Sequence, residues 1–318
     1  MKKIIPFICS AIVLGGCSMT SKENEFEAKE DESEVVENND VIVGKGGIKL
    51  DANDFVRVQD YNGDGYTLRN SGKTKGIIAD KHDVIEEEII TYFKDKQKTD
   101  VIVHNIIPAV DAATVFVESK GEPHFYSYAM VPVDQKTKTI KRNSVFMQEG
   151  EIESDITSAM FAMVYAEEFA NLDAYLEKVT KEYSLIGLTK EAFERIGGNG
   201  YSTPCYFVNA MFQEHTETYQ AYIENPHITK EEIEKRFSHL FTPDNISYGI
   251  TLYMAEDGKE PDEEIYDKII SDLEKLNNIP PGSYSLVLHD NLINAKVGSA
   301  SKGNSIHKTA LNEVIKEE

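Results

Sequence analysis

Residues 114–134, TVFVESKGEPHFYSYAMVPVD, read as two strands joined by a turn. In the second strand, expected over 124–133, apolar and small side chains alternate with tyrosines, as in a strand that buries one face. Gly, Glu and Pro at 121–123 are typical of the turn before it, and the first strand is expected at 113–118. Because another strand is expected at 101–107, this region predicts an antiparallel sheet.

Helical patterns lie on both sides of these strands. Residues 80–98 place Ile85, Ile89 and Phe93 on one face at four-residue spacing, which predicts a helix. We also expect helices at 153–183 (broken near 166–171), 189–197, 229–240 and 262–277, and strands at 66–70, 247–254 and 283–289. These elements mix without a regular strand–helix–strand rhythm, so the predicted class is α+β with mostly antiparallel strands.

The N-terminus has the features of an export signal. Two lysines precede the apolar stretch Ile4–Gly16, which is shorter than the about 20 residues of a membrane-spanning helix and has the length of a signal-peptide core. Leu14-Gly15-Gly16-Cys17 then resembles the lipobox of bacterial lipoproteins. The alternative is a plain signal peptide with a chance cysteine.

The lipobox resemblance implies a defined modification of Cys17. Small residues at 15 and 16 allow a peptidase to approach, and the Cys17 thiol is the nucleophile that takes diacylglycerol. In such lipoproteins the new amino group can be acylated as well, for example with palmitate. We therefore expect removal of residues 1–16 and a lipid anchor on the extracytoplasmic face of the cell membrane.

The mature chain divides into three expected regions. Residues 17–53 are expected to form a disordered tether, because nine acids and two lysines lie between residues 20 and 40 with few apolar side chains. Residues 54–295 are expected to fold as one large or two small domains. Residues 296–318 are small and polar, and we expect a flexible tail there.

Charge and cysteine content exclude several classes of function. The formal net charge is −22, and loss of the signal with Lys2 and Lys3 makes it −24, which argues against nucleic acid as a partner. Of the cysteines Cys9, Cys17 and Cys205, the last alone would remain in the fold, so an internal disulfide and a zinc ribbon are excluded. No cofactor-binding motif is evident, and we expect no cofactor.

One short motif matches the first half of a calcium loop. Asp60, Asn62 and Asp64 occupy positions 1, 3 and 5, and Gly65 follows at the position of the sharp turn. The twelfth position, where a bidentate Glu is needed, is Ser71. The alternative is a turn rich in Asn and Asp within a hairpin.

Two further patterns have structural alternatives. The glycine-rich segment 197–204 lacks the preceding strand and the Gly-Lys-Ser/Thr of a phosphate loop, so it favours a helix end and wide turn. Cys205, His124 and His215 contain the elements of a nucleophile–base pair, but nothing in the sequence brings them together. A cysteine beside apolar residues is usually a buried small side chain.

Four stretches carry a family resemblance: VQDYNGDGYTLRN (58–70), TVFVESKGEPHFYSYAMVPVD (114–134), GLTKEAFERIGGNGYSTP (187–204) and IPPGSYSLVL (279–288). In this order they resemble an uncharacterised family of lipoproteins of Gram-positive bacteria. The resemblance implies a lipid-anchored envelope protein and supplies no active-site residues. The one position to which it assigns a role is Cys17.

The sequence therefore favours a tethered binding or interaction module over an enzyme, because no catalytic signature is present. Its small-molecule or protein partner stays open. A hydrolase of envelope polymers, acting through a pair of carboxyl groups, is the alternative. A calcium-dependent module at Asp60, Asn62 and Asp64 is the third hypothesis.

Overall fold

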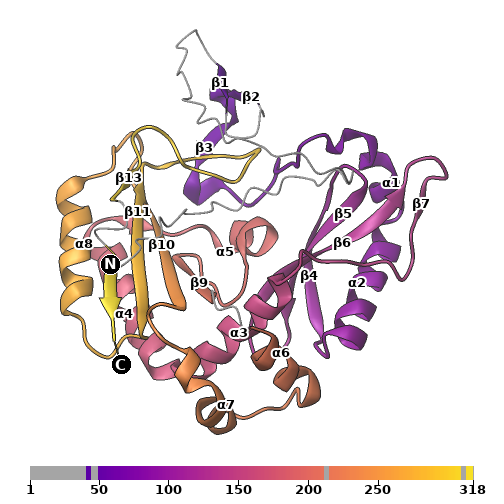
Figure 1. The fold of residues 1–318 in the computed structure, drawn as a ribbon. Helices are drawn as coiled ribbons and strands as arrows, with labels where there is room; N and C mark the ends of the chain where they lie inside the picture. The colour runs from indigo at the N-terminus through magenta and orange to yellow at the C-terminus, as the bar shows by residue number, and fades with distance from the viewer. Residues whose placement is uncertain (1–40, 44–48, 211–214, 309–312, 318) are drawn as a thin grey trace, which may run out of the picture. The chain divides into compact units, whose positions relative to one another are not determined.

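The computed structural model describes residues 41–43, 49–210, 215–308 and 313–317 of the chain (Figure 1). The chain divides into two compact units, Met1–Asp54 and Phe55–Glu318. The expected signal peptide, Cys17 and the acidic stretch up to residue 40 lie outside the described residues. Within the described part, every helix is too short or too polar to cross a bilayer.

The described residues of the first unit form a small strand pair. β1 (Val41–Val43) pairs antiparallel with β2 (Lys49–Asp51), and the short 3-10 turn η1 (Ala52–Asp54) follows. In this turn the Asp51 carboxylate accepts a bond of 2.8 Å from the backbone N–H of Asn53. At these residues the structure has strands where we expected a coil.

The predicted antiparallel sheet is confirmed in the second unit. Its order is β4-β5-β6-β7, formed by β4 (Val101–Pro108), β5 (Ala112–Ser119), β6 (Tyr126–Asp134) and β7 (Thr139–Ile140). Helix α2 (His82–Lys96) packs on this sheet after the short α1 (Lys75–Asp80). Ile85, Ile89 and Phe93 of α2 are fully buried, as the spacing predicted.

A larger, six-stranded sheet contains the second half of the chain. Its strands are β8 (Leu185–Ile186), β9 (Tyr206–Ala210), β10 (Ile246–Met254), β11 (Gly282–His289), β13 (Ile306–His307) and β14 (Val314–Lys316). β10 and β11 are parallel and are joined by α8 (Glu263–Lys275), which Figure 1 shows beside β11. The other pairings are antiparallel, so the α+β class is confirmed.

Helices connect the two sheets. α3 (Glu151–Val164) contacts both β6 and β9, and it is followed by α4 (Ala166–Glu182), so the predicted long helix breaks at Tyr165. α6 (His215–Glu224) and α7 (Lys230–Phe237) pack against α3. α7 begins as predicted, because the Thr229 hydroxyl accepts a bond from the backbone N–H of Glu232.

The expected strand at 66–70 is wrong. Its backbone is used by other contacts, since the Tyr66 N–H donates to Gly63 and the Thr67 N–H donates to Lys296. Upstream, β3 (Phe55–Arg57) pairs with β12 (Leu292–Asn294), and the 3-10 turns η2 (Val58–Asp60) and η3 (Ser71–Lys73) complete this region. These contacts give the segment a turn geometry in which it is paired with no neighbouring strand of the described residues.

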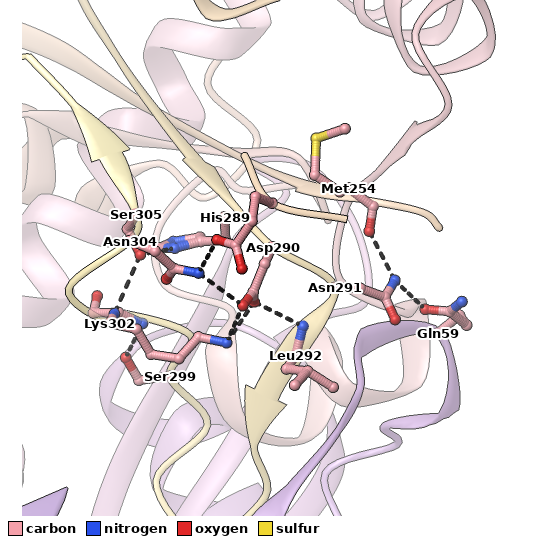
Figure 2. A network of polar contacts seen from close by, with 12 residues as sticks. Gln59, Met254, His289, Asp290, Asn291, Leu292, Ser299, Lys302, Asn304 and Ser305 are labelled. Carbon is pink, nitrogen blue, oxygen red and sulfur yellow. Dashed lines mark hydrogen bonds and ion pairs between the residues drawn. The ribbon is translucent and has the colours of Figure 1, made fainter. Parts of the chain in front are cut away.

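The segment after residue 295 contributes to the sheet, whereas we expected a flexible tail. β13 and β14 both pair with β11. Upstream of them, the Lys302 ammonium lies 2.5 Å from both carboxylate oxygens of Asp290, in the polar network drawn in Figure 2. The polar, glycine-containing sequence of this segment therefore gave no indication of the ion pair or of the two short strands.

The last strand offers a direct test of this attachment. Val314 is 5% exposed and the next residue, Ile315, is 63% exposed, because successive strand side chains face opposite ways. Val314→Asp should lower the free energy of unfolding by about 2–4 kcal/mol, since it buries an unpaired charge. Urea unfolding measures the loss, and Ile315→Asp is the matched control with an expected change below about 0.5 kcal/mol. Equal effects of the two variants would contradict the pairing of β14.

Candidate functional site

Two of the three candidate calcium ligands, Asp60 and Asp64, pair with arginines. Asp60 pairs with Arg57 at 2.6 Å, and Asp64 pairs with the Arg195 guanidinium at 2.9 Å. The Asn62 side chain accepts from the Asp64 N–H and donates to its carboxylate, which is a local turn of the alternative kind. A calcium ion at this loop would have to compete with both guanidinium groups.

Cys205 is half-buried, and this partial burial raises the pKa of its thiol to about 11. At neutral pH this group is therefore a thiol and a poor nucleophile. His124 lies two residues before the start of β6, and its ring is 5.4 Å from that of Tyr126. His215 is the first residue of α6. His124 belongs to a different polar cluster, which the sequence analysis did not predict.

This cluster consists of His104, Glu118 and Glu194, with His124 beside it, and is called the His104 cluster below. One ligating atom from each of the first three residues lies within 4.8 Å of the other two. The His104 Nε2 and a Glu118 carboxylate oxygen are 2.7 Å apart, and the His124 Nε2 is 3.6 Å from the other Glu118 oxygen. Two imidazoles and two carboxylates therefore converge at one place.

A β-bulge places His104. The pairing of β4 with β5 shifts between Val103 and Asn105, so His104 is the extra residue in the strand. Such a bulge turns a side chain out of the regular alternation, and bulges are frequent beside functional sites. Glu118 comes from the neighbouring strand β5. The Asn105 side chain donates a bond of 3.0 Å to the Arg195 carbonyl, which fixes β4 to the next segment.

An irregular helical turn places Glu194. The predicted helix at 189–197 begins at the Thr189 cap, continues as α5 (Lys190–Ala192) and becomes the π-helical turn η4 (Phe193–Gly197). In this turn the Gly198 N–H donates to the Phe193 carbonyl five residues back. π-Turns of this kind are often found at functional sites.

Tyr126 holds η4 and the glycine-rich segment against the sheet. Its backbone exchanges two hydrogen bonds with Gly200, of 2.9 and 2.8 Å, and its ring packs edge-on against Phe193 at 4.8 Å. A Cβ atom on Gly198 would lie 2.6–2.9 Å from Tyr126 side-chain atoms, so glycine is needed for this approach. The segment is thus a wide turn after a helix, as the sequence indicated.

The electrostatics of the cluster are set by burial and by the carboxylates. The side chains of His104, Glu118 and Glu194 are 15%, 17% and 16% exposed, so they are largely buried but keep some contact with solvent. Burial raises the pKa of Tyr126, and the nearby Glu118 and Glu194 carboxylates raise it further. The Lys190 ammonium lies 3.0 Å from Glu194. Beside the cluster, an open depression of about 390 Å³ is lined by Ile102, Glu118, Ser119, Lys120, Gly121, Glu122 and His124.

A second polar group lies behind this cluster and is closed to solvent. Asp155 of α3 accepts a bond of 2.5 Å from Ser127, and burial raises the pKa of its carboxyl well above the usual value. Ser158 on the same helix accepts a bond from the Tyr201 N–H. Because this group is buried, its role is to join α3, β6 and the glycine-rich segment.

The sequence analysis missed the His104 cluster because its members are far apart in the chain. The signal available was a histidine at position 104 within the apolar run VIVHNII and a glutamate at the end of VFVE. A polar side chain inside a buried strand needs a partner. No sequence pattern, however, links either strand to Glu194.

These features define an α+β protein with an open cluster of histidine and carboxylate side chains. Residues 49–316 match the family described as "Protein of unknown function (DUF1672)", so the chain belongs to this family. A comparison with curated proteins finds no match.

A solved structure has the same fold. It is the crystal structure of a DUF1672 family protein from Staphylococcus aureus subsp. aureus Mu50, which covers 83% of this chain and 99% of its own, with a TM-score of 0.68. The identity is 20%, so the similarity shows the fold alone. The family resemblance is thus confirmed, while its lipoprotein aspect stays a prediction.

The glycine-rich segment provides a test of how Glu194 is positioned. Gly198→Ala should lower the free energy of unfolding by about 1–3 kcal/mol, because the new methyl group collides with Tyr126. Gly197→Ala is the matched control, since the nearest atom to a Cβ there is 3.8 Å away. Thermal and urea unfolding measure both changes. A Gly198→Ala protein no less stable than the control would contradict the close approach.

The network in Figure 2 predicts a pH dependence. His289 is 5% exposed, its Nδ1 is 2.8 Å from the Ser305 hydroxyl, and burial lowers its pKa from 6.5 to about 4. Between these pH values the unfolded chain binds a proton that the folded chain does not, so the free energy of unfolding falls as the pH decreases.

For His289 the loss between pH 7 and pH 4.5 should be on the order of 2–3 kcal/mol. His289→Gln removes this titration, so urea unfolding at the two pH values should show a smaller loss in the variant than in the unchanged chain. The same loss in both proteins would contradict the lowered pKa.

Proposed function

We propose that this protein is a lipid-anchored binding module on the extracytoplasmic face of the cell membrane. The observation that carries the proposal is Leu14-Gly15-Gly16-Cys17 at the end of a short apolar segment. Burial of an acyl chain contributes about 0.8 kcal/mol per CH₂, and two chains give stable anchoring where one does not. The diacylglycerol on Cys17 would supply two.

The site geometry favours binding over hydrolysis. Glu118 of the His104 cluster and the neighbouring His124 line an open depression at the surface, so a ligand in it would contact the edge of the cluster. Hydrolysis of an envelope polymer needs a carboxylic acid of raised pKa facing the substrate. Asp155 has such a pKa, but it is 2% exposed and is bonded to Ser127 inside the fold. Burial also raises the pKa of Asp173, but this residue of α4 is not among those that line the depression, and its carboxylate accepts a bond of 2.9 Å from the Tyr206 hydroxyl.

Charge restricts the kind of ligand. A mature chain at −24 repels nucleic acids and other polyanions. The calcium hypothesis is weakened by Arg57 and Arg195, which already neutralise Asp60 and Asp64. We therefore place the binding function at the His104 cluster, where histidine nitrogens and carboxylate oxygens converge.

Replacement of the modified cysteine tests the anchor. In the organism that makes the protein, Cys17→Ser should abolish lipidation, so the protein should leave the membrane fraction and the N-terminal peptide should lack the mass of diacylglycerol. Cys9→Ser is the matched control within the same segment and should change neither property. A Cys17→Ser protein that is processed normally and stays in the membrane fraction would refute the anchor.

A further inference from the structure

We propose that His104, Glu118 and Glu194 bind a divalent transition-metal ion of the Zn²⁺ type. This inference names the ligand of the binding site proposed above and in that sense rests on the proposed function. Its three residues come from β4, β5 and η4, so the fold creates the site and no linear motif encodes it.

The distances suit a metal after small side-chain movements. The three ligating atoms lie within 4.8 Å of one another, and those of His104 and Glu118 are already 2.7 Å apart. A tetrahedral ion with bonds of about 2.0–2.1 Å needs its ligand atoms about 3.3 Å apart. The His104 and Glu118 atoms would therefore have to separate by about 0.6 Å, and the Glu194 carboxylate would have to move inward.

The chemistry of the ligands selects the class of metal. Imidazole nitrogen suits Zn²⁺ and related transition metals, whereas Ca²⁺ takes six to eight oxygen ligands. The Glu118 and Glu194 carboxylates together balance a charge of +2. His124, 3.6 Å from Glu118, or a water molecule in the open depression would complete the coordination.

Lys190 occupies the position of a competing cation. Its ammonium is 3.0 Å from a Glu194 carboxylate oxygen. The Lys190 side chain is 79% exposed, so this ion pair contributes little stability and is easily displaced. The cluster thus already attracts positive charge, and removal of Lys190 should strengthen metal binding, whereas a purely structural ion pair predicts no such gain.

Isothermal titration with ZnCl₂ tests the proposal on the full chain produced without an affinity tag. We expect one ion to bind per chain. His104→Gln and Glu194→Gln should each weaken binding at least about tenfold, because each removes a ligand. Lys190→Met should tighten binding by about two- to fivefold. Co²⁺ titration supplies an independent readout, because the visible absorption of the bound ion reports a tetrahedral environment.

The matched control is another histidine beside carboxylates. His82 lies 3.7 Å from Asp83 and 4.0 Å from Glu86 on the surface of α2, so His82→Ala should leave the Zn²⁺ affinity unchanged. Far-ultraviolet circular dichroism without metal verifies that each variant is folded. Absence of one-to-one binding, unchanged affinity in the His104 and Glu194 variants, or an equal loss in His82→Ala would overturn the proposal.

The metal and anchor proposals fail separately. If the protein leaves the membrane when Cys17 is replaced but binds no Zn²⁺, the anchor proposal stands and the metal proposal is refuted. If the protein binds Zn²⁺ through His104 and Glu194 but carries no lipid, the metal proposal stands and the anchor proposal is refuted.

Discussion

The turn formed by α5 and η4 is held against the four-stranded sheet by Tyr126 of β6, together with the bond from the Asn105 side chain of β4 to the Arg195 carbonyl. The Tyr126 backbone pairs with Gly200, and its ring contacts Phe193 and fills the space left by the missing side chain of Gly198. These contacts hold the turn that contains Glu194 close to β5, which contains Glu118. The proposed metal site therefore depends in part on an aromatic residue that is not itself a ligand.

The glycine-rich segment that follows this turn lies against the buried Asp155 of α3. Burial raises the pKa of its carboxyl, so the folded chain holds this proton more firmly than the unfolded chain does. The sign follows by linkage: this group favours folding below the usual carboxyl pKa, and the benefit is lost as the pH rises through the raised value. Around it, the hydroxyl of Tyr128 and the side-chain oxygen of Asn199 are buried without a partner in the described part of the chain. The contact between α3, β6 and the glycine-rich segment thus contains unpaired buried polar groups, which lower the stability of the fold. Such groups are common where a fold fixes a site.

Elements with a clear period were predictable, and elements defined by distant partners were not. The spacing of Ile85, Ile89 and Phe93 predicted α2, and Thr229 predicted the start of α7, because helical periodicity and capping are local. β14 escaped notice, because its three residues become a strand only beside β11. At 66–70 the error was the opposite one, because a strand was expected where the structure has none. The Thr67 N–H bonds to the Lys296 carbonyl there, and not to a neighbouring strand.

The proposed site was unpredictable for a related reason. Regular alternation along β4 would predict which face of the sheet the His104 side chain occupies, but the bulge after Val103 changes that face. At Glu194 the backbone forms the π-helical turn η4, whereas a regular helix was expected. Periodic side chains build the layers of this fold, whereas the two irregular backbone segments direct the polar side chains of the cluster. At 20% identity a relative can share the layers while the cluster has to be examined in each chain. The class of fold therefore follows from the periodic part of the sequence. Any function at the His104 cluster follows from the two segments that break this periodicity, the bulge in β4 and the turn η4.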